Sequence, residues 1–174
     1  SYSVTGVQTC ALPISAISDI AVFISIPDKK IIEQAREVNP DIYTITISTK
    51  SNADVTISPD NTKGGELAAR HLHGNGHTHV AVHLSESHPT RMERYKAFFA
   101  EFKLLNPDAK IDTIIEKTGQ TTKETLMNYF NSSIELPSAI LFLTGAFAEI
   151  YYNEFFKKSP ERFTSLSAMA FDRP

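Results

Sequence analysis

The 174-residue sequence has a single cysteine, no surplus of positive charge and no long hydrophobic run. Cys10 has no partner with which to form a disulfide within the chain. Lys and Arg number 17 and Asp and Glu number 20, so the net charge is -3 and nothing favours binding of nucleic-acid phosphates by this segment itself. No apolar run approaches the roughly 18 residues that span a bilayer. With 41% hydrophobic residues, the composition suits a globular protein of one domain or two small lobes.

Motifs of catalysis and phosphate binding are also missing. The sequence contains neither G-x-G-x-x-G nor G-x-x-x-x-G-K-[ST], and no serine lies in G-x-S-x-G. Six histidines fall between His71 and His88, which suggests a metal site. However, His71 and His73 are two positions apart on an expected helix and do not share a face, and His79 and His83 share a strand face that could equally be interior. We therefore expect no metal, no cofactor and no enzymatic activity.

The first fifteen residues have the character of a foreign segment. Val4 to Ile14 resembles the translation of a common sequencing-adapter oligonucleotide. A native strand or the end of a signal peptide is the alternative. A signal peptide needs a positively charged start, and no Lys or Arg precedes Lys29. We expect residues 1–15 to be non-native and the native chain to start near Ala16, part-way through a domain. Cys10 then carries no information about the redox compartment.

From Ala16 onward, short β-prone runs alternate with helical patterns. This alternation predicts an α/β fold with parallel sheets flanked by helices. The continuous apolar run Ile20 to Ile24 is typical of a strand buried on both faces. Asp60 or Asn61 is a suitable cap for the helix that follows. Strands are expected at 20–24, 42–47, 54–57, 79–84, 113–116, 139–143 and 166–171, and helices at 29–38, 62–73, 90–105, 121–130 and 147–157.

Four local patterns occur in a fixed order along the chain. They are S-P-D-N-T-K-G-G-E-L-A-A at 58–69, H-L followed by N-G-H and a strand at 71–82, R-M-E-R-Y at 91–95, and A-F-D-R-P at 170–174. This series resembles the effector-binding domain of the lactose-repressor and galactose-repressor family of bacterial transcription regulators. The resemblance runs from about Ile20 to Pro174. It implies a two-lobed fold like that of periplasmic binding proteins, with the first lobe incomplete at 16–74 and a C-terminally truncated second lobe at 75–174.

The sequence departs from the family pattern at several positions. Arg94 replaces the glycine that follows the family's arginine, and Thr144-Gly145 replaces an Asn-Asp pair, so a sugar-contacting carboxylate is missing there. Ala170 begins the last motif in place of glycine, and Pro174 comes one residue early. These changes leave the fold expectation intact but do not fix the class of ligand.

Four residues are candidates for ligand binding. Arg91 and Asp172 follow strands of one expected parallel sheet, and ligands of such sheets bind beyond the carboxyl ends of the strands. The Arg91 guanidinium can donate in bidentate fashion to hydroxyls or a carboxylate, and Asp172 can accept from hydroxyls. Phe147 can stack on a ring face, and Thr144 completes the set. Each has a structural alternative: a solvated first-turn residue for Arg91, a helix cap for Asp172 and a core aromatic for Phe147.

The leading hypothesis is the ligand-sensing domain of a cytoplasmic transcription regulator. A small polar effector, a sugar or similar metabolite, would bind between the lobes and control DNA binding by an N-terminal head outside this chain, in a full-length homodimer that has no membrane contact. A solute-binding protein of a sugar-type transporter is the alternative with the same fold. A small α/β enzyme is a third possibility.

Overall fold

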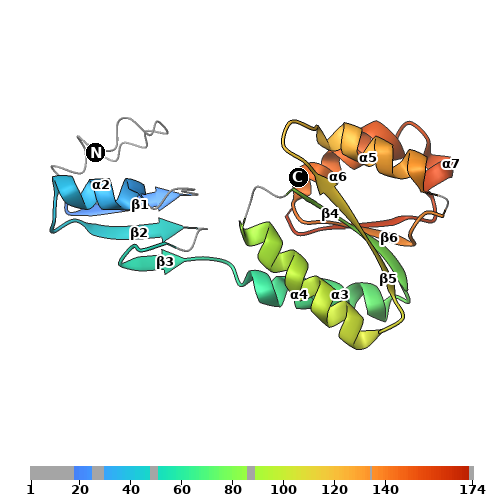
Figure 1. The fold of residues 1–174 in the computed structure, drawn as a ribbon, viewed down its shortest axis with the longest axis horizontal. Coiled ribbons are helices and arrows are strands. Elements are labelled where there is room, and N and C mark those ends of the chain that lie inside the picture. Colours follow the sequence, from blue (N-terminus) through green and yellow to red (C-terminus); the bar gives the residue numbers. More distant parts are fainter. Residues whose placement is uncertain (1–17, 25–29, 48–50, 86–88, 134, 173–174) are drawn as a thin grey trace. The chain divides into compact units, whose positions relative to one another are not determined.

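The computed structural model describes residues 18–24, 30–47, 51–85, 89–133 and 135–172 (Figure 1). The chain divides into two compact units between Pro59 and Asp60, and each is described by itself. The segment 1–15, expected to be foreign, lies outside the described residues.

The first unit is a small parallel sheet with one described helix. Its elements are β1 (Ile20–Ile24), α2 (Lys30–Val38), β2 (Tyr43–Ile47) and β3 (Val55–Ile57), and the strand order is β1-β2-β3. The strand β1 is not buried on both faces as its sequence predicts, because Val22 is 54% and Ile24 is 68% exposed. The physical reason is that its exposed side chains lie on the face of the sheet opposite α2, where Tyr43 and Ile57 are also exposed.

A polar network occupies part of the interior of this unit. Thr44 is fully buried, and its backbone N–H and its hydroxyl both donate to Asp54 Oδ2 at 2.7 Å. Arg36 on α2 donates to Asp54 Oδ1 at 3.0 Å and to the Thr44 hydroxyl at 3.1 Å. Hydrogen bonds from Thr44 come first among the causes that lower the pKa of Asp54 to about 2. Helix α2 is therefore tied to the sheet by charge-assisted hydrogen bonds as well as by Ile32 and Ala35.

The second unit is a larger α/β structure. Its parallel sheet has the order β5-β4-β6-β7, and its helices lie in two layers on opposite faces of that sheet (Figure 1). Its elements are α3 (Asn61–Gly74), β4 (His79–Ser85), α4 (Pro89–Leu105), β5 (Lys110–Glu116), α5 (Thr122–Ser132), β6 (Ala139–Phe142), α6 (Gly145–Tyr151), the π-helical η2 (Tyr152–Phe156), α7 (Pro160–Phe163) and β7 (Ser167–Ala170).

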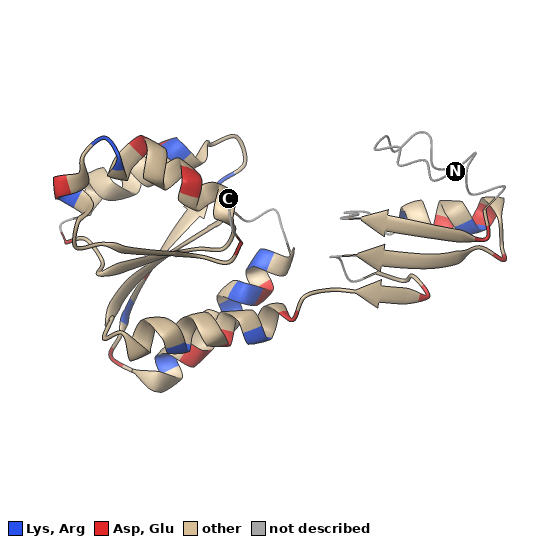
Figure 2. Ribbon diagram, turned by 180° about the vertical axis from the view of Figure 1, so that it is seen from behind, with Lys and Arg blue, Asp and Glu red and all other residues tan. Residues whose placement is uncertain are grey.

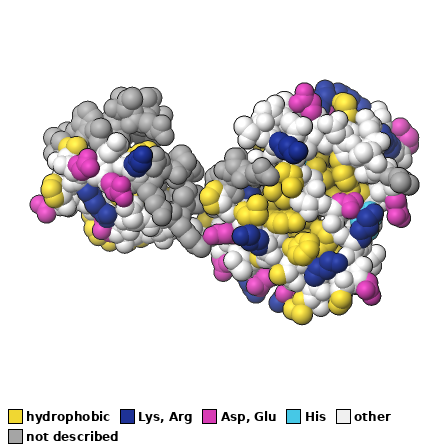
Figure 3. Space-filling model, in the orientation of Figure 1, with side chains coloured by type: hydrophobic (Ala, Val, Ile, Leu, Met, Phe, Trp, Pro, Cys, Tyr) yellow, Lys and Arg dark blue, Asp and Glu magenta, His cyan; other side chains and the backbone are white. Residues whose placement is uncertain are grey.

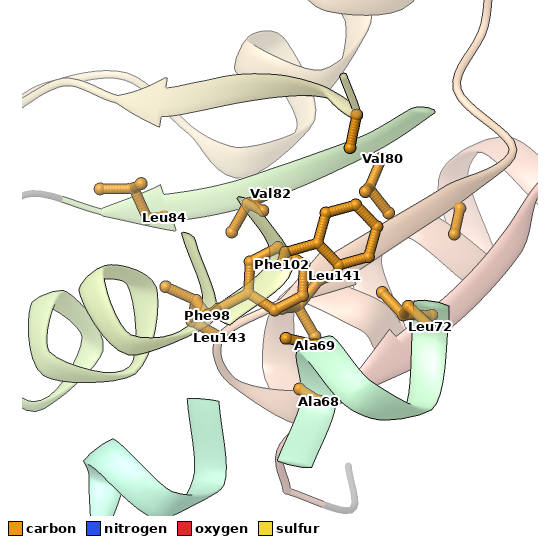
Figure 4. Close-up of a cluster of buried hydrophobic side chains, with 12 residues drawn as sticks. Ala68, Ala69, Leu72, Val80, Val82, Leu84, Phe98, Phe102, Leu141 and Leu143 are labelled. Carbon is orange, nitrogen blue, oxygen red and sulfur yellow. The ribbon is translucent and has the colours of Figure 1, made fainter. Parts of the chain in front are cut away.

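Hydrophobic clusters fill both faces of this sheet. One cluster joins alternate residues of β4, including Val80 and Val82, to Phe98 and Phe102 of α4 and to small residues of α3 (Figure 4). The other lies on the opposite face and includes Phe130 and Phe142. Strand β6 is fully buried, as a parallel strand covered on both faces requires. On the face drawn in Figure 3, hydrophobic side chains also gather between the two helical layers.

Helix α3 packs directly on α4 within the second unit, and glycine permits the close approach. A Cβ atom on Gly65 would come within 2.4 Å of the Arg94 carbonyl oxygen. The division into compact units at 59/60 places α3 in the second unit, because the apolar face of α3 is buried against α4 and β4. The lobe boundary expected after residue 74 stays a prediction. The Asp60 cap is confirmed, since its side chain accepts from the Lys63 N–H at 2.8 Å.

Candidate functional site

Charged and aromatic side chains meet at the carboxyl edge of the four-stranded sheet. Strands β4 and β5 end together at the pair Ser85 and Glu116, and β6 and β7 end together at Phe142 and Ala170. The opening turns of α4 approach this edge and are rich in basic residues (Figure 2). In parallel α/β sheets, this is the edge at which ligands bind.

Arg91 and Phe147, which the sequence proposed separately, lie together. The Arg91 guanidinium carbon is 5.0 Å from the centre of the Phe147 ring, in the geometry of a cation–π contact. Phe147 is buried in the first turn of α6, and His83 of β4 meets its ring edge-on at 4.6 Å between centroids. Phe147 is thus a core aromatic, which was the structural alternative, and it also supports Arg91, whereas its stacking on a ligand ring stays a prediction.

His83 is a buried polar group beneath this pair. It has no exposed surface, and neither ring nitrogen has a hydrogen-bond partner. Burial lowers the pKa of His83 to about 4, and the positive charge of Arg91 acts in the same direction. The imidazole is therefore neutral at pH 7, and its 3.6 Å approach to Glu116 is no ion pair there. The sequence left open whether the face shared by His79 and His83 is interior, and at His83 it is.

Arg94 is the site residue that sequence reasoning missed. Its Nε donates to Asn61 Oδ1 at 2.9 Å, and its Nη1 donates to the Leu143 carbonyl oxygen at 2.9 Å. The same Nη1 is 3.4 Å from Asp172 Oδ2, and the guanidinium carbon is 4.7 Å from the Phe171 ring centre. The only sequence signal was an arginine where the related family has glycine. One side chain therefore connects the starts of α3 and α4 with the ends of β6 and β7.

Asp172 and Thr144 occupy the same edge as Arg94. Asp172 pairs with Arg94 rather than with Arg91, and its side chain remains 56% exposed. Thr144 directly follows Leu143 and is the N-cap residue of α6, but its hydroxyl makes no cap hydrogen bond. The structure thus brings together Arg91 with Phe147, and Asp172 with Arg94, and among the described residues no hydrogen bond or ion pair joins the two pairs.

Other candidate sites are weaker. A pocket of about 470 Å³ between α6, η2 and the start of β7 is lined by Tyr151, Phe156, Leu166, Ala168 and their neighbours, with almost no polar surface to orient a ligand. Across the described ranges, no group of three or more His, Cys, Asp or Glu residues is placed to hold a metal ion. No helix within those ranges is long and apolar enough to cross a membrane.

Solved structures of LacI-family transcription regulators share this fold. The regulator from Lactobacillus brevis matches with a TM-score of 0.74 and 14% identity over 96% of this chain and 64% of its own. A regulator from Enterococcus faecium with bound ribose matches at 0.71 and 17%, over 95% of this chain and 63% of that one. A periplasmic binding protein/LacI regulator from Alkaliphilus metalliredigens, complexed with D-xylulofuranose, matches at 0.68 and 17%, over 95% and 61%.

These matches confirm the fold that the sequence motifs implied. The chain has the α/β fold of LacI-family regulators and spans less than two thirds of the length of these three. No family model and no curated protein matches the sequence.

Proposed function

We propose that this chain is the ligand-sensing part of a cytoplasmic bacterial transcription regulator and that it binds a small polar effector, a sugar or similar metabolite, at the carboxyl edge of the four-stranded sheet. The observation that carries the proposal is the meeting of Arg91, Phe147, Arg94 and Asp172 at that edge. Such a set offers guanidinium donors, a carboxylate acceptor and an aromatic face, which is the chemistry that polyhydroxylated ligands require.

Each candidate residue has a distinct role in this proposal. The Arg91 guanidinium, backed by Phe147, donates to ligand oxygens, and exposed Asp172 accepts from ligand hydroxyls. The Thr144 hydroxyl, which is not used as a cap, offers one more donor or acceptor. Two similar structures hold ribose and D-xylulofuranose, which favours a sugar over other small polar molecules.

Control of DNA binding would need parts that this chain does not contain. The net charge of -3 gives no positive surplus for DNA contact, so a separate head would bind the operator, and the full-length protein would act as a homodimer without contact to a membrane. We expect no catalytic activity and no cofactor. A transporter's solute-binding protein would use the same site, and the match to LacI-family regulators favours the regulator.

Ligand-induced stabilisation tests the proposal. The 174-residue chain is unfolded thermally with a panel of pentoses, hexoses and their acid and phosphate forms. A ligand present at 100 times its Kd raises the free energy of unfolding by about 2.7 kcal/mol. We expect at least one member to raise the melting temperature in a saturable way. If no member does so at millimolar concentration, the proposal is wrong.

A further inference from the structure

Two arginines lie at the carboxyl edge of the four-stranded sheet, and they differ in their electrostatic partners. Arg94 faces Asp172 at 3.4 Å. Arg91 rests on the Phe147 ring, and no carboxylate in the described ranges forms an ion pair with it. Because Arg94 and Asp172 offset one another, the positive charge of Arg91 is left to act on a ligand.

Arg94 is held in place independently of any ligand. Its bonds to Asn61 Oδ1 and to the Leu143 carbonyl oxygen, both 2.9 Å, fix the guanidinium beside Asp172. These acceptors come from α3 and from the end of β6, so the side chain cannot leave without losing both bonds. Asp172 is still 56% exposed and retains oxygen lone pairs for a ligand.

Two further carboxylates lie near this edge and oppose an anionic ligand. Glu93 accepts from Asn61 Nδ2 at 3.1 Å, and Glu116 accepts from the Thr122 hydroxyl at 2.6 Å. Without Arg94, the single charge of Arg91 would face these two carboxylates and an unbalanced Asp172. The presence of Arg94 therefore decides whether the edge tolerates a negative group.

We propose that Arg94 is a specificity-determining residue, and that it makes this site select a sugar derivative with a carboxylate or phosphate group over the neutral sugar. In this arrangement Arg91 binds the anionic group, Asp172 accepts from hydroxyls, and Arg94 cancels the repulsion that Asp172 exerts on the anion. The inference rests on the proposed function and names its ligand class.

The test compares affinities for three probes, D-ribose, D-ribonate and D-ribose 5-phosphate, by titration calorimetry at constant ionic strength. The wild-type chain should bind one of the two anions at least about tenfold more tightly than ribose, the scale of one charge-assisted hydrogen bond. Whether ribonate or the phosphate is preferred identifies the anionic group. Arg94→Gln should lower the ratio of anion to ribose affinity by about tenfold, whereas Arg94→Lys keeps the charge and most of the ratio.

Two more variants control this experiment. Asp172→Asn should raise the same ratio, because it leaves Arg94 without its counter-charge. The Asp172 side chain is 56% exposed, so we expect the variant to fold. Lys96→Gln, at an exposed position of the same helix, should leave the ratio unchanged. If Arg94→Gln does not fold, the role of Arg94 is tested by the ratio of anion to ribose affinity in the wild type and in Asp172→Asn.

The outcomes separate this inference from the proposed function. Ribose bound as tightly as both anions by the wild type, or a ratio unaffected by Arg94→Gln, overturns the role of Arg94 while sugar binding stands. A fall in the ratio with Asp172→Asn overturns it in the same way. If none of the three probes nor any other sugar of the panel binds, both proposals are wrong.

Discussion

The two units contain parallel sheets of similar local sequence but very different surroundings. In the first, the edge strand β1 exposes Val22 and Ile24, and buried Thr44 is satisfied by Asp54. In the second, β6 is buried along its whole length and both hydrophobic clusters of the described residues lie on its sheet. The comparison shows that an apolar strand sequence sets strand formation, whereas burial depends on which elements cover the sheet.

The difference in how the two sheets are covered also bears on which unit can support a ligand site. Among the described residues, the second unit combines a sheet covered on both faces with a charged carboxyl edge, and a rigid support is what a ligand site needs in order to hold donors in place. The first unit is held in part by the ion pair of Arg36 and Asp54, whose side chains are 33% and 37% exposed, and such partly exposed pairs contribute little to stability.

The largest expected difference between the two units is in the hydrogen-exchange rates of their central strands. Central strands β2 and β4 are both paired on two sides, so Thr46 and Val82 are matched positions. We expect the amides of β2 to exchange about 1,000-fold faster than those of β4, because local opening in the first unit exposes less buried apolar surface. Exchange followed by NMR or mass spectrometry measures this. Equal protection of the two strands would remove the distinction between the units.

The next largest expected effect is a loss of stability on substitution of Gly65 in α3. Gly65→Ala places a Cβ atom against the Arg94 carbonyl oxygen and the Phe98 backbone nitrogen, at 2.4 and 2.8 Å, and neither backbone atom can move without shifting α4. We expect a loss of about 3 kcal/mol in the free energy of unfolding of the second unit, measured by urea denaturation.

Gly74→Ala is the matched control in the same helix. A Cβ atom there meets nothing within 4 Å, so the substitution should be neutral or stabilise by up to about 1 kcal/mol through helix propensity. Equal effects of the two alanines would show that the contact between α3 and α4 is looser than described.

A smaller effect concerns acid stability. His83 has a pKa of about 4 when folded and 6.5 when unfolded, so the unfolded chain takes up the proton first as the pH falls. Stability from this group is complete above pH 6.5 and is lost as the pH falls from 6.5 towards 4. Between pH 7 and pH 5 the loss should be about 2 kcal/mol.

The variant His83→Leu isolates this contribution. It should flatten the pH dependence and cost little at pH 7, since it also removes two buried nitrogens that have no hydrogen-bond partner. Glu116 and Arg91 are unchanged in the variant, so the comparison isolates the imidazole. An unchanged slope of stability against pH in the variant would show that His83 is not the group responsible.

Local signals predicted most of the fold. The Asp60 cap, the alternation of strands and helices and the spacing of Phe98 and Phe102 each act over a few residues, so sequence alone locates α3, β4 and α4. The four-residue helix α7 was not predicted, because it has too few residues to show a period. The expected helix at 147–157 covers η2, but its π-helical geometry was not predicted. The exposure of β1 depends on which face of the sheet other elements cover, and sequence periodicity does not contain that information.

The site was predictable only in outline. Parallel topology places Arg91 and Asp172 at one edge of the sheet, and that edge is where both pairs lie. The partner of Asp172 was missed, because Arg94 is 78 positions away in sequence and its value comes from contacts with three other elements. In the sequence motif, Arg94 stands where the related family has glycine, and that difference alone indicates no role for it.

Calorimetric titration of Arg91→Ala tests the central claim most directly, with Lys96→Ala on the same helix as its control. The ligand is the member of the sugar panel that binds the wild-type chain. Loss of a charged hydrogen bond of about 1.5–3 kcal/mol predicts an affinity about 10- to 100-fold weaker for Arg91→Ala. The control should bind like the wild type. Undiminished affinity in Arg91→Ala would contradict the account, because it would place the effector away from the carboxyl edge of the sheet.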